Sequence, residues 1–240
     1  MIGSQNPKIQ RLRRLLGRRS SRLEEGVFVI EGPTLVREAV EAGLNIEAVY
    51  AEFAGLSYVP QDVEVIEVAD GVLAKVGSTV SPQPILAVAS LLTRPVPSDA
   101  TFVVACAGVA DPGNAGTILR SAEAAGADAV VFTAGSVDVY NPKCVRASAG
   151  ALFHVPVSVD VDLRALGLPV VGAVADGGTP HDAYDLRAPV MLVLGNEAHG
   201  LPTDLALDGL ITVEHVGRAE SLNVAMAATV LCFEVARQRR

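Results

Sequence analysis

Apolar and polar positions alternate along the chain in two patterns, which predict strands and helices in turn. Short continuous apolar runs bounded by glycine, proline or polar residues are typical of strands that are buried on both faces of a parallel sheet. In the second half of the chain such runs predict strands at 102–107, 129–132, 155–159, 170–175, 190–194 and 211–214. Helices are predicted near 117–125, 142–149 and 163, and a long alanine-rich helix at 221–238. This alternation predicts an α/β fold with a parallel sheet and helices on both faces.

The N-terminal part shows the same alternation on a smaller scale. Asn6-Pro7 is a helix-start signal, and Ile9, Leu12 and Leu15 or Leu16 follow at helical spacing. Strands are predicted at 27–30, 46–50, 63–68 and 85–89, and helices at 35–42 and near 71–76. A stretch rich in proline and polar residues then separates two apolar runs. We therefore expect a small α/β domain at 1–93, a linker at 94–99 and a second domain at 100–240.

Composition favours a soluble protein in a reducing compartment. Half of the residues are hydrophobic but only 4% are aromatic, so the core must consist mainly of small aliphatic side chains. The longest charge-free run, 76–93, contains glycines and prolines, and the N-terminus lacks the apolar region of a signal peptide. The cysteines are Cys106, Cys144 and Cys232, with no CxxC pair. We expect no membrane span, no zinc site and a cytoplasmic location.

The formal net charge of −8 conceals an asymmetry between the N-terminus and the rest of the chain. Residues 1–25 contain seven basic and two acidic residues, a net charge of +5, whereas residues 26–240 contain 12 basic and 25 acidic residues, a net charge of −13. A basic arm on an acidic body indicates a polyanionic partner for the arm, although a solvated surface helix would show the same charge.

Several common chemistries lack the residues they need. No G-x-G-x-x-G follows a strand, and no G-x-S-x-G elbow is present. Gly195 and Gly200 have the spacing of a P-loop, but Leu201-Pro202 stands where lysine and serine or threonine would be required. The four histidines show no metal-ligand spacing, and each is interpreted as structural or solvated. The sequence therefore offers no nucleotide-hydrolysis site and no metal site.

Three polar clusters remain, each after a predicted strand of the second half. They are Asp111–Gly116 with Arg120, Gly195–Gly200, and Glu220–Asn223. If their strands share one parallel sheet, all three loops meet at its carboxyl edge, where ligands usually bind. A role in a helix cap or a turn is enough to explain Asn114 and Ser221. Ser221 is predicted to cap its helix or to contact a ligand. Glu197 and Arg120 are harder to explain as scaffold, and a bidentate pair between them is expected.

The three clusters closely resemble the motifs of a known family. Asn114-x-Gly116-x-x-x-Arg120, Leu194-Gly195-Asn196-Glu197-x-x-Gly200-Leu201 and Ser221-Leu222-Asn223-Val224-Ala225 are similar to the three motifs of the SpoU/TrmH branch of the SPOUT RNA methyltransferases. They occur in that family's order and cover the second half of the chain. The stretches 140–143 and 146–150 and the pair Gly217-Arg218 resemble further parts of the family. Asn6-Pro7-Lys8 and Phe28–Gly32 resemble the L30e-like RNA-binding domain that many members carry.

The resemblance implies a fold, a cofactor and a reaction. It implies a SPOUT-type domain with a deep trefoil knot, an exception to the rule against threaded chains, preceded by an L30e-like domain. It also implies a homodimer that transfers a methyl group from S-adenosylmethionine to a ribose 2′-hydroxyl. The cofactor site implied in this way comprises Leu194, Gly195, Asn196, Gly200, Val213 and Leu222. The sequence departs from the family in having Ala198-His199 where a glycine often follows the glutamate.

The resemblance also implies how the residues divide the chemistry. Arg120 would act on the 2′-hydroxyl, with Asn114, Glu197, Ser221 and Asn223 positioning it or the ribose. Because an arginine side chain is always protonated, Arg120 suits the role of stabilising an oxyanion better than that of a base. RNA contacts are expected from Arg11, Arg14, Arg18, Lys143, Arg146 and Arg218.

The substrate and the activity leave alternatives open at this point. Large ribosomal RNA, 23S RNA in particular, is the expected substrate, and transfer RNA is the alternative. A non-catalytic RNA-binding protein with the same fold is a further reading. The set formed by Arg120, Asn114, Glu197 and Asn223 favours the enzyme, because a binding module does not need it.

Overall fold

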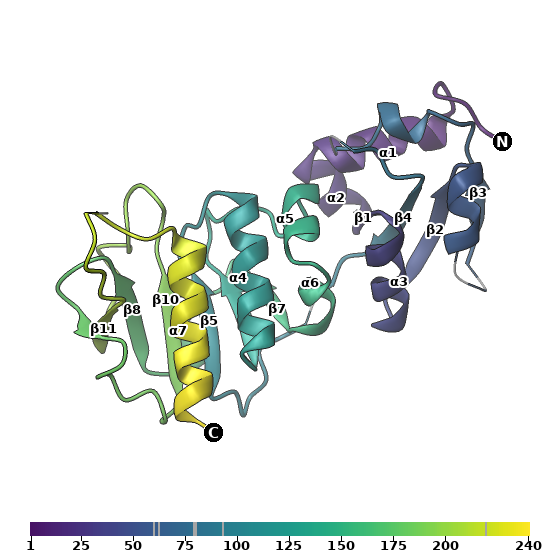
Figure 1. The fold of residues 1–240 in the computed structure, drawn as a ribbon. Helices are drawn as coiled ribbons and strands as arrows, with labels where there is room; N and C mark the ends of the chain where they lie inside the picture. The colour runs from purple at the N-terminus through teal and green to yellow at the C-terminus, as the bar shows by residue number, and fades with distance from the viewer. Residues whose placement is uncertain (60, 62, 79–80, 93, 219) are drawn as a thin grey trace. The chain divides into compact units, whose positions relative to one another are not determined.

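The computed structural model describes residues 1–240 except 60, 62, 79, 80, 93 and 219, and it divides into two compact units (Figure 1). One unit comprises Met1–Leu92 together with Asp138–Phe153, and the other comprises the rest of the chain. The predicted linker at 94–99 follows this division, and Thr93, the last residue of the predicted first domain, lies outside the described residues. Residues 138–153 were expected in the second domain, but they pack with the N-terminal residues.

The second unit contains a sheet of seven strands among the described residues, in the order β7-β6-β5-β10-β8-β11-β9, and every neighbouring pair is parallel. The strands are β5 (Phe102–Cys106), β6 (Ala129–Phe132), β7 (Val157–Val159), β8 (Val170–Val174), β9 (Thr179–Pro180), β10 (Val190–Leu194) and β11 (Gly209–Thr212). The strands β5, β6 and β10 are buried along their whole length, as their continuous apolar runs predict. The predicted α/β fold with a parallel sheet is confirmed, and the trefoil knot stays a prediction.

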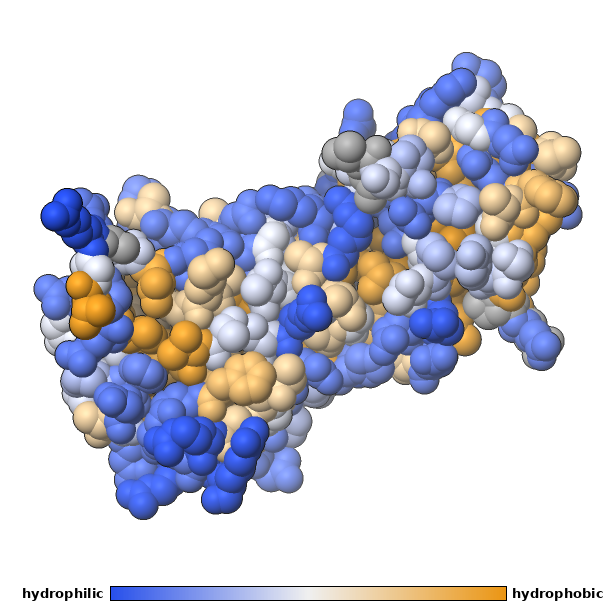
Figure 2. Space-filling view, in the orientation of Figure 1, coloured by the Kyte–Doolittle hydropathy of each residue, from blue (hydrophilic) through white to orange (hydrophobic). Residues whose placement is uncertain are grey.

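Two long helices, α4 (Pro112–Ala124) and α7 (Val224–Gln238), lie side by side over this sheet (Figure 1). The hydroxyl groups of Ser121 and Thr229 join them at 2.7 Å. One side of α7 carries the buried Leu231 and Val235, whereas Met226 and Phe233 are 64% and 44% exposed. Figure 2 shows apolar side chains gathered over this helix. The helix therefore presents an apolar outer face as well as an apolar inner one.

Both helices start at residues other than those that the sequence pattern predicts, because a capping side chain sets where each helix begins. We expected α4 from Thr117, but the Asp111 carboxylate accepts hydrogen bonds from the backbone N–H groups of Gly113 and Asn114, at 2.7 and 2.9 Å, and starts the helix earlier. We expected α7 from Ser221. Asn223 is its cap instead and accepts from the N–H groups of Ala225 and Met226.

The first unit contains a four-stranded sheet in the order β1-β4-β2-β3, formed by β1 (Val27–Glu31), β4 (Ile85–Ser90), β2 (Ile46–Ala51) and β3 (Val65–Glu67). The pairs β1–β4 and β2–β4 are antiparallel, and β2–β3 is parallel. The helices are α1 (Pro7–Gly17), α2 (Arg19–Glu25) and α3 (Pro33–Glu41), with 3-10 turns at Phe53–Tyr58 and Leu73–Lys75. The predicted strands and the helix starts at Asn6-Pro7 and near Leu35 are confirmed.

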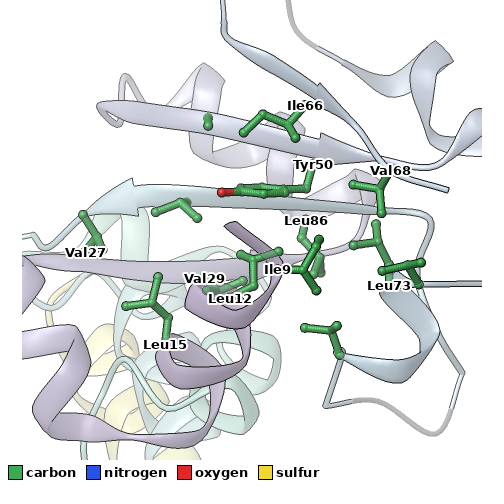
Figure 3. Close-up of a cluster of buried hydrophobic side chains, with 14 residues drawn as sticks. Ile9, Leu12, Leu15, Val27, Val29, Tyr50, Ile66, Val68, Leu73 and Leu86 are labelled. Carbon is green, nitrogen blue, oxygen red and sulfur yellow. The ribbon is translucent and has the colours of Figure 1, made fainter. Parts of the chain in front are cut away.

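The helix α1 covers one face of this sheet. Its buried Ile9, Leu12 and Leu15 pack against a cluster that includes Val29 and Leu86 (Figure 3). The Asn6 side chain caps the helix by accepting the Lys8 N–H at 2.9 Å. The helical apolar spacing therefore serves the core of this unit, and the basic residues between those positions face outward.

Residues 138–153 form two short helices, α5 (Pro142–Ala147) and α6 (Ala151–His154), where the sequence predicts one at 142–149. The break falls at Ala149 and Gly150, whose φ angles of 50° and 97° are incompatible with a continuous helix. The segment is tied to the N-terminal residues by ion pairs between Asp138 and the buried Arg22 and between Arg146 and Glu31. Long-range charge pairing of this kind leaves no local signal in the sequence.

No helix in the described part of the chain is long and apolar enough to cross a membrane.

Candidate active site

The three polar clusters lie at the carboxyl edge of the parallel sheet. The strands β5 and β10 are neighbours, and β11 lies beyond β8 on the other side of β10. Asn114 lies in the first turn of α4, after β5, Glu197 lies in the loop after β10, and Asn223 caps α7, after β11. The prediction that these loops meet at one edge is confirmed by the hydrogen bonds that join them.

Glu197 holds the loop after β10 to the N-terminus of α4. One carboxylate oxygen, Oε1, accepts the Asp111 N–H at 3.1 Å and the Asn114 side-chain amide at 2.9 Å. The other, Oε2, accepts the Ala110 N–H at 3.0 Å. Partial burial alone would raise the pKa of Glu197, but the bonds from Asn114, Ala110 and Asp111 outweigh it and lower this pKa below its ordinary value. The charged form of the carboxylate is therefore the one that the site stabilises.

Asn223 extends this connection to the third loop. Its side-chain amide donates to Asn114 Oδ1 at 3.0 Å, while its own oxygen caps α7. Because the Asn114 amide donates in turn to Glu197, the chain Asn223–Asn114–Glu197 joins all three loops. We call this chain of side chains the Asn–Asn–Glu relay.

The loop after β10 is closed by its own backbone. Asn196 and Gly200 exchange two hydrogen bonds, with N–O distances of 2.8 and 2.9 Å. A Cβ atom on Gly195 would clash with the backbone of Gly200 and Leu201. The family resemblance places Gly195 in the cofactor site, and the structure gives a separate reason for glycine, which is that the loop closes against this residue.

Asn196 and Ser136 fix the turn after β5. The Asn196 amide donates to the Gly108 carbonyl at 2.8 Å. Ser136 Oγ donates to the Cys106 carbonyl and accepts the Gly108 N–H, both at 3.0 Å. Gly108 has a φ of 79°, which favours glycine. Ser136 was not predicted from the sequence, since a buried serine that bonds only backbone groups belongs to no motif.

A pocket of about 340 Å³ opens at this edge of the sheet. The implied cofactor residues all line it, namely Leu194, Gly195, Asn196, Gly200, Val213 and Leu222. Glu197, Ser221 and Asn223 line it too. Further walls come from the end of β8 and from Ile211, His215 and Leu231, which the sequence analysis did not single out. The pocket combines apolar walls with a few polar groups, as small-molecule sites do.

Arg120 does not line this pocket within its own chain. Its side chain is exposed on α4 and forms no ion pair with any described residue. The predicted bidentate pair between Glu197 and Arg120 is therefore wrong for the single chain. Two backbone N–H groups at the start of α4 and the Asn114 amide take both oxygens of Glu197 instead.

The residues expected to contact RNA fall into two groups. Arg11 forms a bidentate pair with Glu47 and a bond to Glu25, and Arg146 bonds Glu31 and Ser78. The hydrogen bond to Glu47 is the main cause that raises the pKa of Arg11. The others are exposed, namely Arg14, Arg18, Lys143 and Arg218. No group of three or more potential metal ligands occurs among the described residues.

Comparison with known proteins identifies the family. Residues 101–233 match the model of the SpoU rRNA Methylase family. The chain belongs to the SpoU rRNA methylase family. Residues 6–87 match the MRM3-like substrate binding domain. The resemblance drawn from the three motifs is thereby confirmed.

Full-length relatives share both parts of the chain. The 23S rRNA (guanosine(2553)-2′-O)-methyltransferase RlmP of Bacillus subtilis is 32% identical over 97% of this chain and 97% of its own. The 23S rRNA (uridine(2479)-2′-O)-methyltransferase of Streptomyces viridochromogenes is 33% identical over 99% of this chain and 92% of its own. The crystal structure of the SpoU methyltransferase AviRb from that organism, in complex with the cofactor AdoMet, superposes with a TM-score of 0.87 at 30% identity and covers 98% of both chains.

Replacing the Glu197 carboxylate by an amide tests its place in the relay. Glu197→Gln keeps the shape of the side chain but replaces one acceptor oxygen with an NH₂ group, which faces N–H donors at the start of α4. We expect a loss of about 0.5–1.5 kcal/mol in the free energy of unfolding, because donors that are only partly shielded from water lose a charged acceptor. Urea unfolding at neutral pH measures it. Glu123→Gln, an exposed residue of α4, is the matched control. Equal stability of the two variants would show that the carboxylate does not hold the loops.

Proposed function

We propose that this protein transfers the methyl group of S-adenosylmethionine to a ribose 2′-hydroxyl of ribosomal RNA, with 23S RNA as the substrate. The observation that carries the proposal is the pocket whose polar wall is joined by the Asn–Asn–Glu relay, in a chain of the SpoU family. The names of two full-length relatives, both 23S rRNA 2′-O-methyltransferases, support the substrate class.

The pocket suits this cofactor in size and in chemistry. Its volume lies within the range of small-molecule sites. Val213, Leu222 and Val224 are apolar lining residues that are not fully buried and can contact a planar base, and the backbone at Val213 offers hydrogen-bonding groups. When bound, the cofactor supplies an electrophilic methyl group on a sulfonium. The residues of the pocket bind and orient that group so that a ribose oxygen can attack in line, and such alignment contributes much of the acceleration.

Arg120 is the residue that we assign to the developing oxyanion. A ribose hydroxyl is a poor nucleophile, and a fixed cation stabilises its alkoxide without needing to take up a proton. Since Arg120 is exposed and does not line the pocket of its own chain, we assign its action to the site of a second copy. The relay residues Asn114, Glu197 and Asn223, with Ser221 beside them, would position the ribose or its partner groups.

A homodimer would supply that second copy. The outer face of α7 exposes three large apolar side chains, Met226, Val230 and Phe233, next to α4, the helix that carries Arg120 (Figure 2). Other apolar residues of this helix, Ala228, Leu231 and Val235, are buried in the chain's own core. A contiguous apolar face of this kind is typical of a protein–protein interface.

The N-terminal unit would bind the RNA backbone. Arg14, Arg18 and Arg19 are exposed near the junction of α1 and α2, and the internal ion pairs of Arg11 leave it less available. Contacts of arginine with phosphates position an RNA but read no base. We place the enzyme in the cytoplasm, where its substrate is found and where its buried cysteines would stay reduced.

Transfer of a labelled methyl group to RNA tests the function and the role of Arg120 together. The wild-type protein should label ribosomal RNA at a ribose 2′ position. Arg120→Ala should lower the rate by on the order of 10²–10³-fold, as removal of one oxyanion donor does, with little change in cofactor affinity. Glu123→Ala, one turn away on α4, is the control. Near-normal turnover of Arg120→Ala would rule out the assigned role, and no labelling by the wild type would rule out the function.

Sedimentation of the purified protein tests the dimer. The wild type should sediment as a dimer at micromolar concentration. Phe233→Glu should give a monomer, because a carboxylate on the apolar face of α7 would be desolvated without a partner. Phe53→Glu changes an exposed aromatic residue of the first unit, 80% exposed against 44% for Phe233, and should leave the dimer intact. A monomeric wild type would contradict the proposal.

A further inference from the structure

His215 occupies a place in the pocket that no motif predicts. All four histidines were predicted to be structural or solvated, yet His215 is half-buried and lines the pocket directly. Its Nδ1 lies 3.2 Å from the carbonyl oxygen of Val213, the residue directly after β11. The ring is therefore held in place by the backbone of the pocket wall.

This contact decides which ring nitrogen can bind a ligand. A carbonyl oxygen only accepts hydrogen bonds, so Nδ1 must carry the proton that it donates to Val213. In the neutral imidazole the other nitrogen, Nε2, is then an acceptor. No hydrogen bond joins Nε2 to a described residue. An acceptor on the wall of a pocket is satisfied either by water or by a donor of the bound ligand.

The surroundings of His215 favour the nucleoside end of the cofactor. Ile211 and Val213 precede it and Leu222 follows it on the pocket wall, and all three are apolar. Apolar walls suit a planar base, whereas the charged amino-acid end of the cofactor suits a carboxylate such as that of Glu197, in the loop after β10. The donors of an adenosyl group are the exocyclic amine of the base and the ribose hydroxyls.

We propose that His215 is a cofactor-binding residue whose Nε2 accepts a hydrogen bond from an N–H or O–H donor of the adenosyl group. The inference rests on the proposed function, since it requires that the pocket binds S-adenosylmethionine. It adds to the backbone contacts of the pocket a side chain that discriminates ligands by their donors. Such discrimination is strong when the alternative ligand leaves a polar group of the site unpaired.

Calorimetric titration with S-adenosylhomocysteine, which carries the same adenosyl group, tests this without any turnover. His215→Phe keeps a ring of similar shape but has no acceptor, and its Kd should rise about fivefold to tenfold, the effect of one hydrogen bond. His215→Gln supplies an acceptor oxygen and should stay within about threefold of the wild type. The melting temperatures of the unliganded proteins should agree, because the role is in binding and not in folding.

S-inosylhomocysteine, which lacks the exocyclic amine, identifies the donor. If the amine is the partner, this ligand should bind to the wild type and to His215→Phe with equal affinity. If a ribose hydroxyl is the partner, His215→Phe should lose affinity by the same factor for both ligands.

Two results would overturn the inference alone. One is unchanged affinity of His215→Phe for S-adenosylhomocysteine, and the other is an equal loss in His215→Gln accompanied by lower melting temperatures, which would indicate a structural role. Failure of the wild type to bind S-adenosylhomocysteine would instead contradict the proposed function, and the inference with it.

Discussion

The carboxylate of Glu197 at the start of α4 is the interaction on which the site depends. The first N–H groups of a helix have no partner within the helix, and the N-terminus carries a partial positive charge. At this helix start Asp111 takes two of these groups, and Glu197 takes the N–H of Asp111 itself and that of Ala110. A charged acceptor strengthens such bonds. The loop after β10 is thus fixed to the loop after β5 by an electrostatic contact, without an apolar core of its own.

The same contact organises the pocket at this edge of the sheet. Asn114 is held by Glu197 and in turn holds Asn223, which caps α7. The third loop, which forms the remaining wall of the pocket, is therefore positioned through two side-chain amides. Within the single chain, Glu197 accepts from Ala110, Asp111 and Asn114 and not from Arg120. The arginine is left exposed on α4, the helix that packs against α7.

Much of the site could be predicted from the sequence because its strands are continuous apolar runs and its loops are short motifs. The order of the runs predicted a parallel sheet, and the sheet brings Asn114, Glu197 and Asn223 to one edge. The motifs did not reveal which donors would meet the Glu197 carboxylate. Charge alone favours Arg120 as the partner of this carboxylate. The backbone N–H groups at the start of α4 are the partners instead, and a sequence pattern does not show where backbone N–H groups will lie.

Other parts were beyond prediction because they depend on contacts distant in sequence. The packing of residues 138–153 with the N-terminal unit rests on the pairs of Asp138 with Arg22 and of Arg146 with Glu31, each separated by more than a hundred residues. The side chains of Ser136 and His215 hydrogen-bond backbone carbonyls, and such contacts follow no sequence spacing. The start of α7 at Val224 was decided by which of two polar residues, Ser221 or Asn223, caps the helix.

The central claim, that the Asn–Asn–Glu relay couples the walls of the pocket, is tested most directly by a double-mutant cycle on cofactor affinity. The Kd for S-adenosylhomocysteine is measured for the wild type, Asn114→Ala, Asn223→Ala and the double variant. Because each single change breaks the same bond, the double variant should lose at least about threefold less affinity than the product of the two single losses. Single losses that multiply independently would contradict the coupling.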